Sequence, residues 1–143
     1  MQLSRHLSLE EFEHSDYANT YGIANYLPPE LLGVATYTAT HLFEAIRSIL
    51  GDKPIKITSG FRNKELNKAI RGVDTSQHCL GEALDMIPEM DVNEAFNKLI
   101  NDKNLVYDQL IREHDASGHT WIHASIKAGK NRQQIIGNLL KPS

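Results

Sequence analysis

The sequence has little of several features that would assign it to a familiar class. Only one cysteine, Cys79, occurs in 143 residues, so no intrachain disulfide can form and the fold must rest on its core, with or without a bound metal. No apolar run of about 18 residues is present, which argues against a membrane-spanning helix. Lysine and arginine number 15 against 18 aspartates and glutamates, and the net charge of −3 gives no general attraction for nucleic acid.

The N-terminal residues also lack the apolar stretch of a classical secretory signal. We therefore expect synthesis in the cytoplasm, with release by another factor if the protein acts outside the cell. The length of the chain suits one domain over residues 1–143, built on one hydrophobic core. We expect that domain to be a monomer.

What is present predicts an α+β fold with a small, largely antiparallel sheet packed by helices. Ser8 suits the start of a short helix, and Pro28 and Pro29 suit the first turn of the clearest one. The polar stretch 15–28 is interpreted as a connector. Helices are predicted over residues 7–15, 28–50, 63–72, 91–103 and 131–140, and strands over 53–61, 82–88, 105–113 and 120–127.

Two histidines and one aspartate are candidate metal ligands. His78 lies just before Gly81, and Asp85 lies in an apolar strand, where a carboxylate is costly to bury unless it is paired or bound to a cation. His123 shares one face of an alternating strand with Trp121, away from the aliphatic face. Each residue alone is more often an ordinary surface or paired side chain. Together the three would form a zinc site with an open fourth position, which is typical of catalytic zinc.

Three spaced blocks give the chain a family resemblance. They are Ser-Gly-Phe-Arg at residues 59–62, Ser-x-His and Gly-x-Ala-x-Asp within residues 76–85, and Trp-x-His at residues 121–123. In order and spacing they resemble the M15 family of zinc peptidases, which act on bacterial cell walls and include D-Ala-D-Ala carboxypeptidases and phage endolysins. The resemblance extends from about residue 9 to about residue 137. It implies the fold that these enzymes share with the hedgehog signalling domain.

The resemblance also implies a set of metal ligands. By its second and third blocks, His78, Asp85 and His123 bind one zinc ion per chain. Gly81 would then let the chain turn, so that a loop histidine and a strand aspartate meet the same ion.

A zinc peptidase also needs a general base that accepts a proton from the attacking water. Some members of the family carry a glutamate three residues before the last histidine, where this chain has Thr120. Glu113 ends the preceding strand, and antiparallel pairing would bring it back near the metal, as in the phage branch of the family. His119 and Asp115, in the turn that follows, are the alternative bases.

Four residues are expected to contact the substrate. Arg62, at a strand end, can hold a carboxylate or a developing oxyanion through two parallel hydrogen bonds, unless it pairs with a nearby acid. Ser76 and Gln77 can donate hydrogen bonds to a peptide backbone, or can instead shape the loop around His78. Trp121 can form a wall of the cleft or simply pack.

These observations together predict a zinc-dependent peptidase that cleaves the peptide stem of bacterial peptidoglycan. The bond would be L-Ala-D-Glu for an endolysin or D-Ala-D-Ala for a carboxypeptidase. The missing signal and the small size favour an enzyme encoded by a phage or prophage, which reaches the cell wall after release. The alternative is a non-catalytic module of the same fold that retains zinc and binds peptidoglycan, alone or as part of a phage tail.

Overall fold

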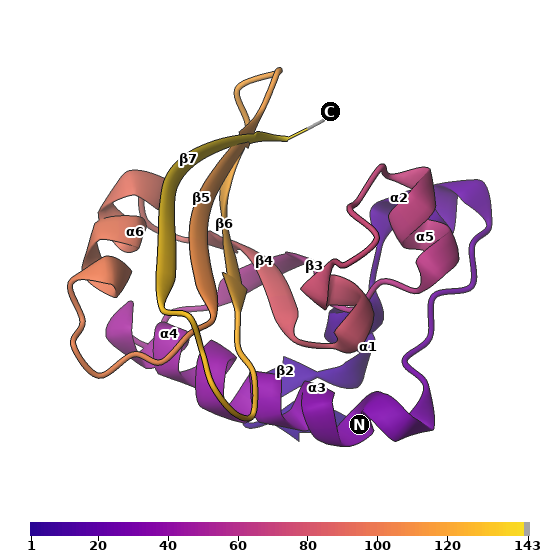
Figure 1. Cartoon of the computed structure of the whole chain (residues 1–143), viewed down its shortest axis with the longest axis horizontal. Coiled ribbons are helices and arrows are strands. Elements are labelled where there is room, and N and C mark those ends of the chain that lie inside the picture. The colour runs from indigo at the N-terminus through magenta and orange to yellow at the C-terminus, as the bar shows by residue number, and fades with distance from the viewer. Residues whose placement is uncertain (142–143) are drawn as a thin grey trace.

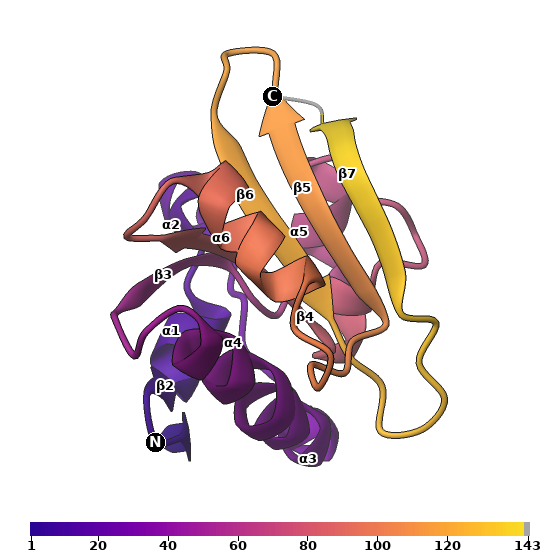
Figure 2. The same cartoon turned by 90° about the vertical axis from the view of Figure 1, so that its left-hand side faces the viewer.

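A five-stranded mixed sheet forms the centre of the fold, in a computed structural model that describes residues 1–141. The strand order is β3-β4-β6-β5-β7, with the first three pairs antiparallel and β5–β7 parallel (Figures 1 and 2). The strands are β3 (Ile55–Ser59), β4 (Ala83–Pro88), β5 (Gln109–Asp115), β6 (Thr120–Ser125) and β7 (Gln134–Lys141). The predicted α+β class with a largely antiparallel sheet is therefore confirmed.

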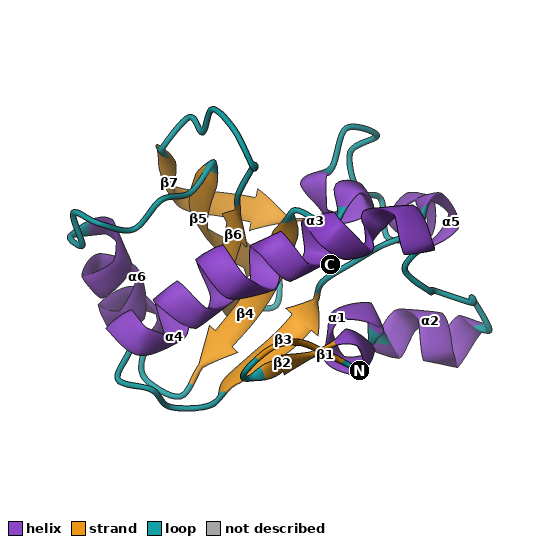
Figure 3. Cartoon of the chain, turned by 90° about the horizontal axis from the view of Figure 1, so that it is seen from below, coloured by secondary structure: helices purple, strands orange, loops and turns teal. Residues whose placement is uncertain are grey.

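Helices surround this sheet, and a small hairpin lies at the N-terminus. The helices are α1 (Leu9–Glu13), α2 (Asp16–Tyr21), α3 (Leu32–Thr38), α4 (Glu44–Ile49), α5 (Lys64–Ala69) and α6 (Val92–Ile100), with the shorter turns η1 (Pro29–Leu31), η2 (Ala39–Phe43) and η3 (Gln77–Leu80). The hairpin pairs β1 (Gln2–Ser4) with β2 (Leu7–Ser8). Figure 3 shows α3 and α4 as one long helix beneath the sheet, continuous through η2.

Side-chain caps explain where several helices begin. Ser8 accepts a hydrogen bond from the Glu11 backbone while the Glu11 side chain returns to Ser8, which forms the capping box of α1. Asn63 and Asp91 cap α5 and α6 without a reciprocal bond, each side chain accepting one hydrogen bond from a backbone N–H. These bonds satisfy N–H groups that have no partner within the helix.

The sheet has one face for the core and one for polar side chains. Leu84, Met86, Ile122 and Ala124 alternate along β4 and β6 and belong to the core cluster, which also includes Phe43 of the long helix. Because successive side chains of a strand point to opposite faces, the intervening residues of the same strands lie on the other face. That second face carries the candidate site.

The predicted helix over residues 131–140 is wrong, because this segment forms β7. Its apolar pairs Ile135–Ile136 and Leu139–Leu140 fit helical spacing, but β5 presents an open edge whose backbone groups need partners. Pairing with that edge gives the backbone N–H and C=O groups of both segments hydrogen-bond partners. The connector 15–28 also contains a helix, α2, and the hairpin of β1 and β2 was not predicted.

Among the described residues 1–141, no helix has both the length and the apolar character needed to cross a membrane.

Candidate metal centre

His78 is held by the short turn η3. The Ser76 hydroxyl accepts a hydrogen bond from the His78 backbone N–H at 3.2 Å, which starts the turn. Gly81 ends it with a φ of 77°, in the left-handed region that glycine adopts at low cost. The predicted role of Gly81 as a turn residue is therefore confirmed. The result is a His78 side chain that is 2% exposed and points into the protein.

Asp85 and His123 face each other on adjacent strands. They are register partners of the antiparallel pair β4–β6, so their side chains leave the same face of the sheet. The His123 ring packs edge-on against the His78 ring, with centroids 5.1 Å apart. All three side chains are buried, and their ligand atoms all lie within 4.8 Å of one another. The predicted ligands are thus brought together.

The distances within this group match those of a metal coordination sphere. Asp85 Oδ1 lies 3.3 Å from His78 Nε2 and 3.0 Å from His123 Nδ1. Around a tetrahedral zinc ion with bonds of about 2.1 Å, neighbouring ligand atoms lie about 3.4 Å apart. A zinc ion would therefore need only small adjustments of these side chains.

The hydrogen bonding of His78 indicates that this group of side chains is suited to bind a cation. Its Nδ1–H donates to the Gly60 carbonyl at 2.7 Å, and burial lowers the pKa of His78 to about 4, so the ring is neutral near pH 7. A neutral imidazole has one N–H, and Nε2 must then carry a lone pair. That buried atom has no hydrogen-bond partner and faces a carboxylate oxygen, an arrangement that a cation between the two would stabilise.

Asp85 is charged in this setting. Although burial by itself raises the pKa of Asp85, the hydrogen bond with His123 Nδ1 at 3.0 Å helps to hold that pKa well below the usual range. Its second oxygen, Oδ2, accepts a hydrogen bond from Arg62 Nη2 at 3.2 Å. One oxygen thus faces the two histidines while the other is fixed by a guanidinium, which leaves Oδ1 to bind the metal.

Arg62 has more contacts within the protein than the sequence suggested. Besides Asp85, its Nε donates to Ser59 Oγ at 2.9 Å and its Nη1 donates to Asn67 Oδ1 at 3.2 Å. The side chain is only 13% exposed. Two of its five N–H groups have no partner among these contacts, so Arg62 can support Asp85 and still present donors to a substrate.

Gly60 explains the first sequence block. A side chain at this position would clash with the carbonyl oxygen of Phe12, whose backbone also accepts from Phe61 N–H at 2.8 Å. The absence of a side chain lets the strand end pack closely on α1 and point its own carbonyl at His78. Gly60 therefore positions a ligand through its backbone.

Glu113 lies on the same face of the sheet as the metal group. It is the register partner of Trp121 in the antiparallel pair β5–β6, two residues along β6 from His123. Diagonal neighbours of this kind are about 7–8 Å apart, within reach of long side chains. Glu113 is 2% exposed, and its Oε1 accepts a hydrogen bond from Trp121 Nε1 at 2.8 Å.

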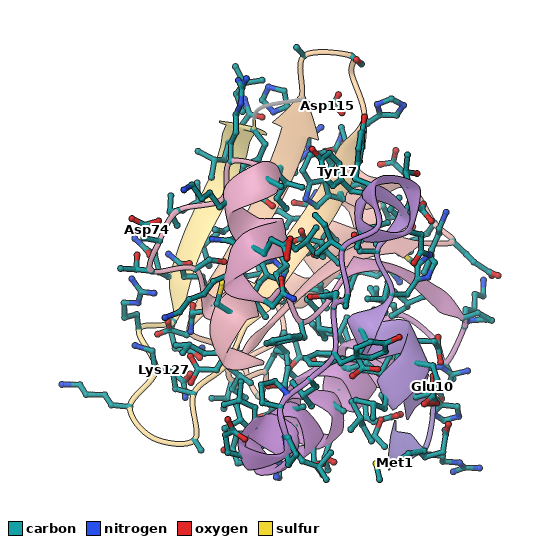
Figure 4. All side chains as sticks on the ribbon, turned by 90° about the vertical axis from the view of Figure 1, so that its right-hand side faces the viewer. Met1, Glu10, Tyr17, Asp74, Asp115 and Lys127 are labelled. Carbon is teal, nitrogen blue, oxygen red and sulfur yellow. The ribbon has the colours of Figure 1, made fainter. Side chains whose placement is uncertain are left out.

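A cleft of about 410 Å³ opens beside this group. Asp85, Arg62 and Trp121 line it, and Figure 4 shows Tyr17 of α2 and Asp115, the last residue of β5, toward the same end of the molecule. The remaining lining residues are Ser15, Asp16, Tyr17, Thr58, Ser59, Leu66, Ile70, Ile87, His119 and Thr120. Of the three predicted ligands, Asp85 is the one among these lining residues, so a substrate in the cleft would meet the metal group on the side of Asp85.

Of the other predicted site residues, Ser76 and Gln77 lie at η3 and His119 lies at the cleft. Ser76 caps η3, and Gln77 donates to Glu82 Oε1 at 3.2 Å; neither is among the residues that line the cleft. Their contact with substrate stays a prediction. His119 lines the cleft and its Nδ1 lies 3.1 Å from Asp115 Oδ2, but its side chain is 78% exposed.

Some contributors to the site were not found from the sequence. Asn67 holds Arg62, and α2 supplies part of the cleft wall. Ser15 caps α2 by accepting from Ala18 N–H at 3.1 Å, and the pair Ser15–Asp16 is a recognisable helix start that could have revealed this helix. The contact of Asn67 with Arg62 depends on tertiary structure and has no local signal.

Comparison with known proteins identifies the family. A stretch of 43 residues is 40% identical to the zinc D-Ala-D-Ala carboxypeptidase of Streptomyces albus G, over 30% of this chain and 17% of that relative. The chain thus matches less than a fifth of the length of this relative. The peptidase M15 family profile matches residues 5–125. Within a chain of this family, the buried group of His78, Asp85 and His123 could bind one metal ion, which confirms the expectation of a zinc cofactor. From its match over most of its length, the chain belongs to the peptidase M15 family.

Proposed function

We propose that the chain is a zinc-dependent peptidase that hydrolyses the stem peptide of bacterial peptidoglycan. The observation that carries the proposal is the buried lone pair of His78 Nε2 facing the charged Asp85 beside an open cleft. Two histidines and one carboxylate are a ligand set of catalytic zinc sites. Family membership supports the peptidase activity, and the zinc D-Ala-D-Ala carboxypeptidase that the chain resembles supports both the metal and the substrate class.

Glu113, Trp121 and Arg62 each have a role in this proposal. A bound zinc ion supplies Lewis-acid chemistry that polarises a peptide carbonyl and makes water more nucleophilic near neutral pH. Glu113 accepts a proton from the attacking water and later delivers it to the leaving amine. Trp121 holds Glu113 Oε1, which leaves Oε2 as the oxygen that carries the proton.

Arg62 would contribute in two ways. Its bond to Asp85 Oδ2 keeps the metal ligand oriented, and its remaining N–H groups can stabilise negative charge on the substrate carbonyl. Ser76 and Gln77 would mainly shape the loop that carries His78. Any contact that they make with the substrate would be a hydrogen bond to the backbone of the bound peptide. We retain Trp121 as a cleft wall that packs against the substrate.

The scissile bond divides the proposal into two forms. The name of the relative favours a D-Ala-D-Ala carboxypeptidase. The resemblance leaves open both this bond and the L-Ala-D-Glu bond, the second for a phage or prophage endolysin. We propose the coarser activity, stem-peptide hydrolysis, by a single-domain monomer that reaches the wall after release. Both bonds occur in the same polymer, so one digestion experiment can distinguish them.

A non-catalytic zinc module that only binds peptidoglycan is the competing function. Such a module would not need an acid near the metal, and burying a carboxylate costs free energy unless it is compensated. Glu113 is nevertheless buried on the metal face. This cost favours a peptidase over a binding module.

Mass spectrometry of products from purified peptidoglycan tests the proposal. We expect new soluble or shortened stem peptides that disappear with a chelator and return with added zinc. A loss of terminal D-alanine would identify the carboxypeptidase, and a free amine on D-glutamate would identify the endopeptidase. Binding to peptidoglycan without any new product would favour the non-catalytic module instead.

A further inference from the structure

Glu113 has a second partner that lies outside the part of the chain matched by the family. Lys141 Nζ lies 3.2 Å from Glu113 Oε2, at the end of β7. The profile of the family ends at residue 125, before β7 begins. This contact is therefore a feature of the chain beyond the matched region.

The parallel pairing of β7 with β5 explains how Lys141 arrives there. In that register Lys141 is the partner of Asp115, two residues along β5 from Glu113, and all three side chains leave the same face of the sheet. Figure 2 shows β7 along the outer edge of β5. The Lys141 side chain spans this diagonal and remains 40% exposed, while Glu113 is 2% exposed.

The start of β7 is anchored beside β5 by side-chain and backbone hydrogen bonds. Arg132 donates to both oxygens of Asp108, with Nη2 2.6 Å from Oδ2. The backbone N–H of Gln134 donates to the Asp108 carbonyl at 3.0 Å, and Gln133 N–H donates to the Tyr107 carbonyl at 3.1 Å. Between Ile111 and Glu113 the register then shifts by one residue, and this irregularity places Lys141 opposite Asp115.

The carboxylate of Glu113 is therefore held at both oxygens. Trp121 Nε1 donates to Oε1 at 2.8 Å, and the ammonium of Lys141 pairs with Oε2, although it is not aligned as a hydrogen bond and leaves that oxygen without a hydrogen-bond partner. We propose that Lys141 is a positioning residue for the reaction, which holds the Glu113 carboxylate in a fixed orientation on the metal face of the sheet. This inference rests on the proposed function, in which Glu113 is the general base.

Two effects follow from an ammonium at this oxygen. It offsets part of the cost of burying the Glu113 carboxylate and restrains its orientation. Once Oε2 carries the proton of the attacking water, the same ammonium favours its transfer onward to the leaving amine. Because the pair is not aligned as a hydrogen bond, the second lone pair of Oε2 stays free to receive the proton.

Kinetics of four lysine variants test the inference on the zinc-loaded chain. Lys141→Met should lower kcat about tenfold, less than the 10²–10⁴ expected for removing the general base itself, with KM changed by less than about twofold. Lys141→Arg keeps a cation within reach and should retain at least about half of kcat. Lys130→Met removes an exposed loop lysine and should change neither constant. Lys141→Gln repeats the test with a polar, uncharged side chain if the methionine variant folds poorly.

A double-mutant cycle with Glu113→Gln shows whether Lys141 acts through Glu113. In that background Lys141→Met should cause no further loss of kcat, because the charge that it serves is gone. Trp121 is the one tryptophan of the chain, so its fluorescence can follow urea unfolding of the same zinc-loaded proteins. Lys141→Met should lower the folding equilibrium constant by about threefold to tenfold in the parent and by much less in Glu113→Gln.

The outcomes separate this inference from the proposed function. An inactive Glu113→Gln together with a fully active Lys141→Met would overturn the role of Lys141 alone. An increase of kcat in Lys141→Met would also overturn it, because the contact would then restrain the base. Full activity in Glu113→Gln would remove the base itself, and the proposed mechanism would fail with it.

Discussion

His78 Nε2 and Asp85 Oδ1 face each other at 3.3 Å with no proton to share. The ring gives its one N–H to the Gly60 carbonyl, and the carboxylate is charged. Two buried acceptors in contact are unfavourable unless a cation lies between them. Three features of the fold hold the two groups in this arrangement: η3, β4 and the packing of Gly60 on α1.

Zinc should stabilise the folded chain, because it relieves this repulsion and binds only the folded arrangement. A free zinc concentration a hundredfold above the dissociation constant would add about 2.7 kcal/mol to the free energy of unfolding. Thermal melts with zinc, with magnesium and with a chelator would measure the effect. Magnesium prefers oxygen ligands and should stabilise much less. Equal stabilisation by both ions would contradict a site of nitrogen ligands.

Glu113→Gln should keep the zinc and lower kcat by about 10²–10⁴, the usual scale for removing a general base. The amide oxygen of glutamine can still accept from Trp121 Nε1, so the fold should be little affected. Steady-state kinetics on a defined stem peptide, with zinc analysis of the same samples, would check it. His119→Ala is the matched comparison, since His119 lines the cleft but is largely exposed. An active Glu113→Gln with an inactive His119→Ala would move the role of base to His119.

Arg62→Lys should be nearly as damaging as Arg62→Ala. Lysine keeps the charge, but it cannot bond Ser59, Asn67 and Asp85 at once. Loss of a residue that orients a metal ligand typically costs about 10–100-fold in metal affinity or activity. Chelator competition would measure zinc affinity, and kinetics would measure the effect on substrate.

The two readouts divide the roles of Arg62. A weaker zinc affinity in both variants would support its action through Asp85. Unchanged zinc affinity with a raised KM would make Arg62 a substrate clamp only. Because its side chain is 13% exposed and makes three bonds, we also expect lower melting temperatures, unlike those of an open surface arginine.

Stability should fall in acid as Asp108 becomes protonated. The hydrogen bonds from Arg132 lower the pKa of Asp108 from 3.8 to about 2. A carboxylate with a lowered pKa stabilises the fold fully above its unfolded value, and that contribution is lost as the pH falls from about 4 to about 2. A shift of this size corresponds to about 2 kcal/mol, reduced by salt because Arg132 is half exposed.

Arg132→Met should remove this dependence and destabilise the chain by about 1–3 kcal/mol near neutral pH, because a buried carboxylate loses its main partner. Urea unfolding at several pH values, with Trp121 fluorescence as the probe, would measure both effects. The gap between parent and variant should close near pH 2. A constant gap at every pH would show that Arg132 contributes packing rather than charge.

Local patterns predicted the elements that build the metal group. Ile55 and Ile57 alternate with polar residues and form β3, while Trp121 and His123 share a face of β6 as expected. The three ligands could be found from the sequence because zinc binding requires side chains such as two histidines and a carboxylate, and the spacing of the sequence blocks indicates which ones. Sequence also placed Glu113 on the strand that pairs with β6.

Contacts between distant segments could not be predicted in this way. Residues 131–140 satisfy a helical pattern as well as an edge strand, and the choice depends on the open edge of β5 rather than on the segment itself. Lys141 therefore could not be related to Glu113 before β7 was known. The same holds for Asn67 and Arg62, whose contact depends on how α5 packs beside β3.

Zinc content is the most direct test of the central claim that His78, Asp85 and His123 form one metal centre. Elemental analysis of protein purified without added metal should give one zinc per chain in the parent. His14→Ala, which removes a half-exposed histidine, should keep that zinc, and His78→Ala should lose it. Equal zinc in the parent and in His78→Ala would contradict the account, because the buried lone pair of His78 would then not be a ligand.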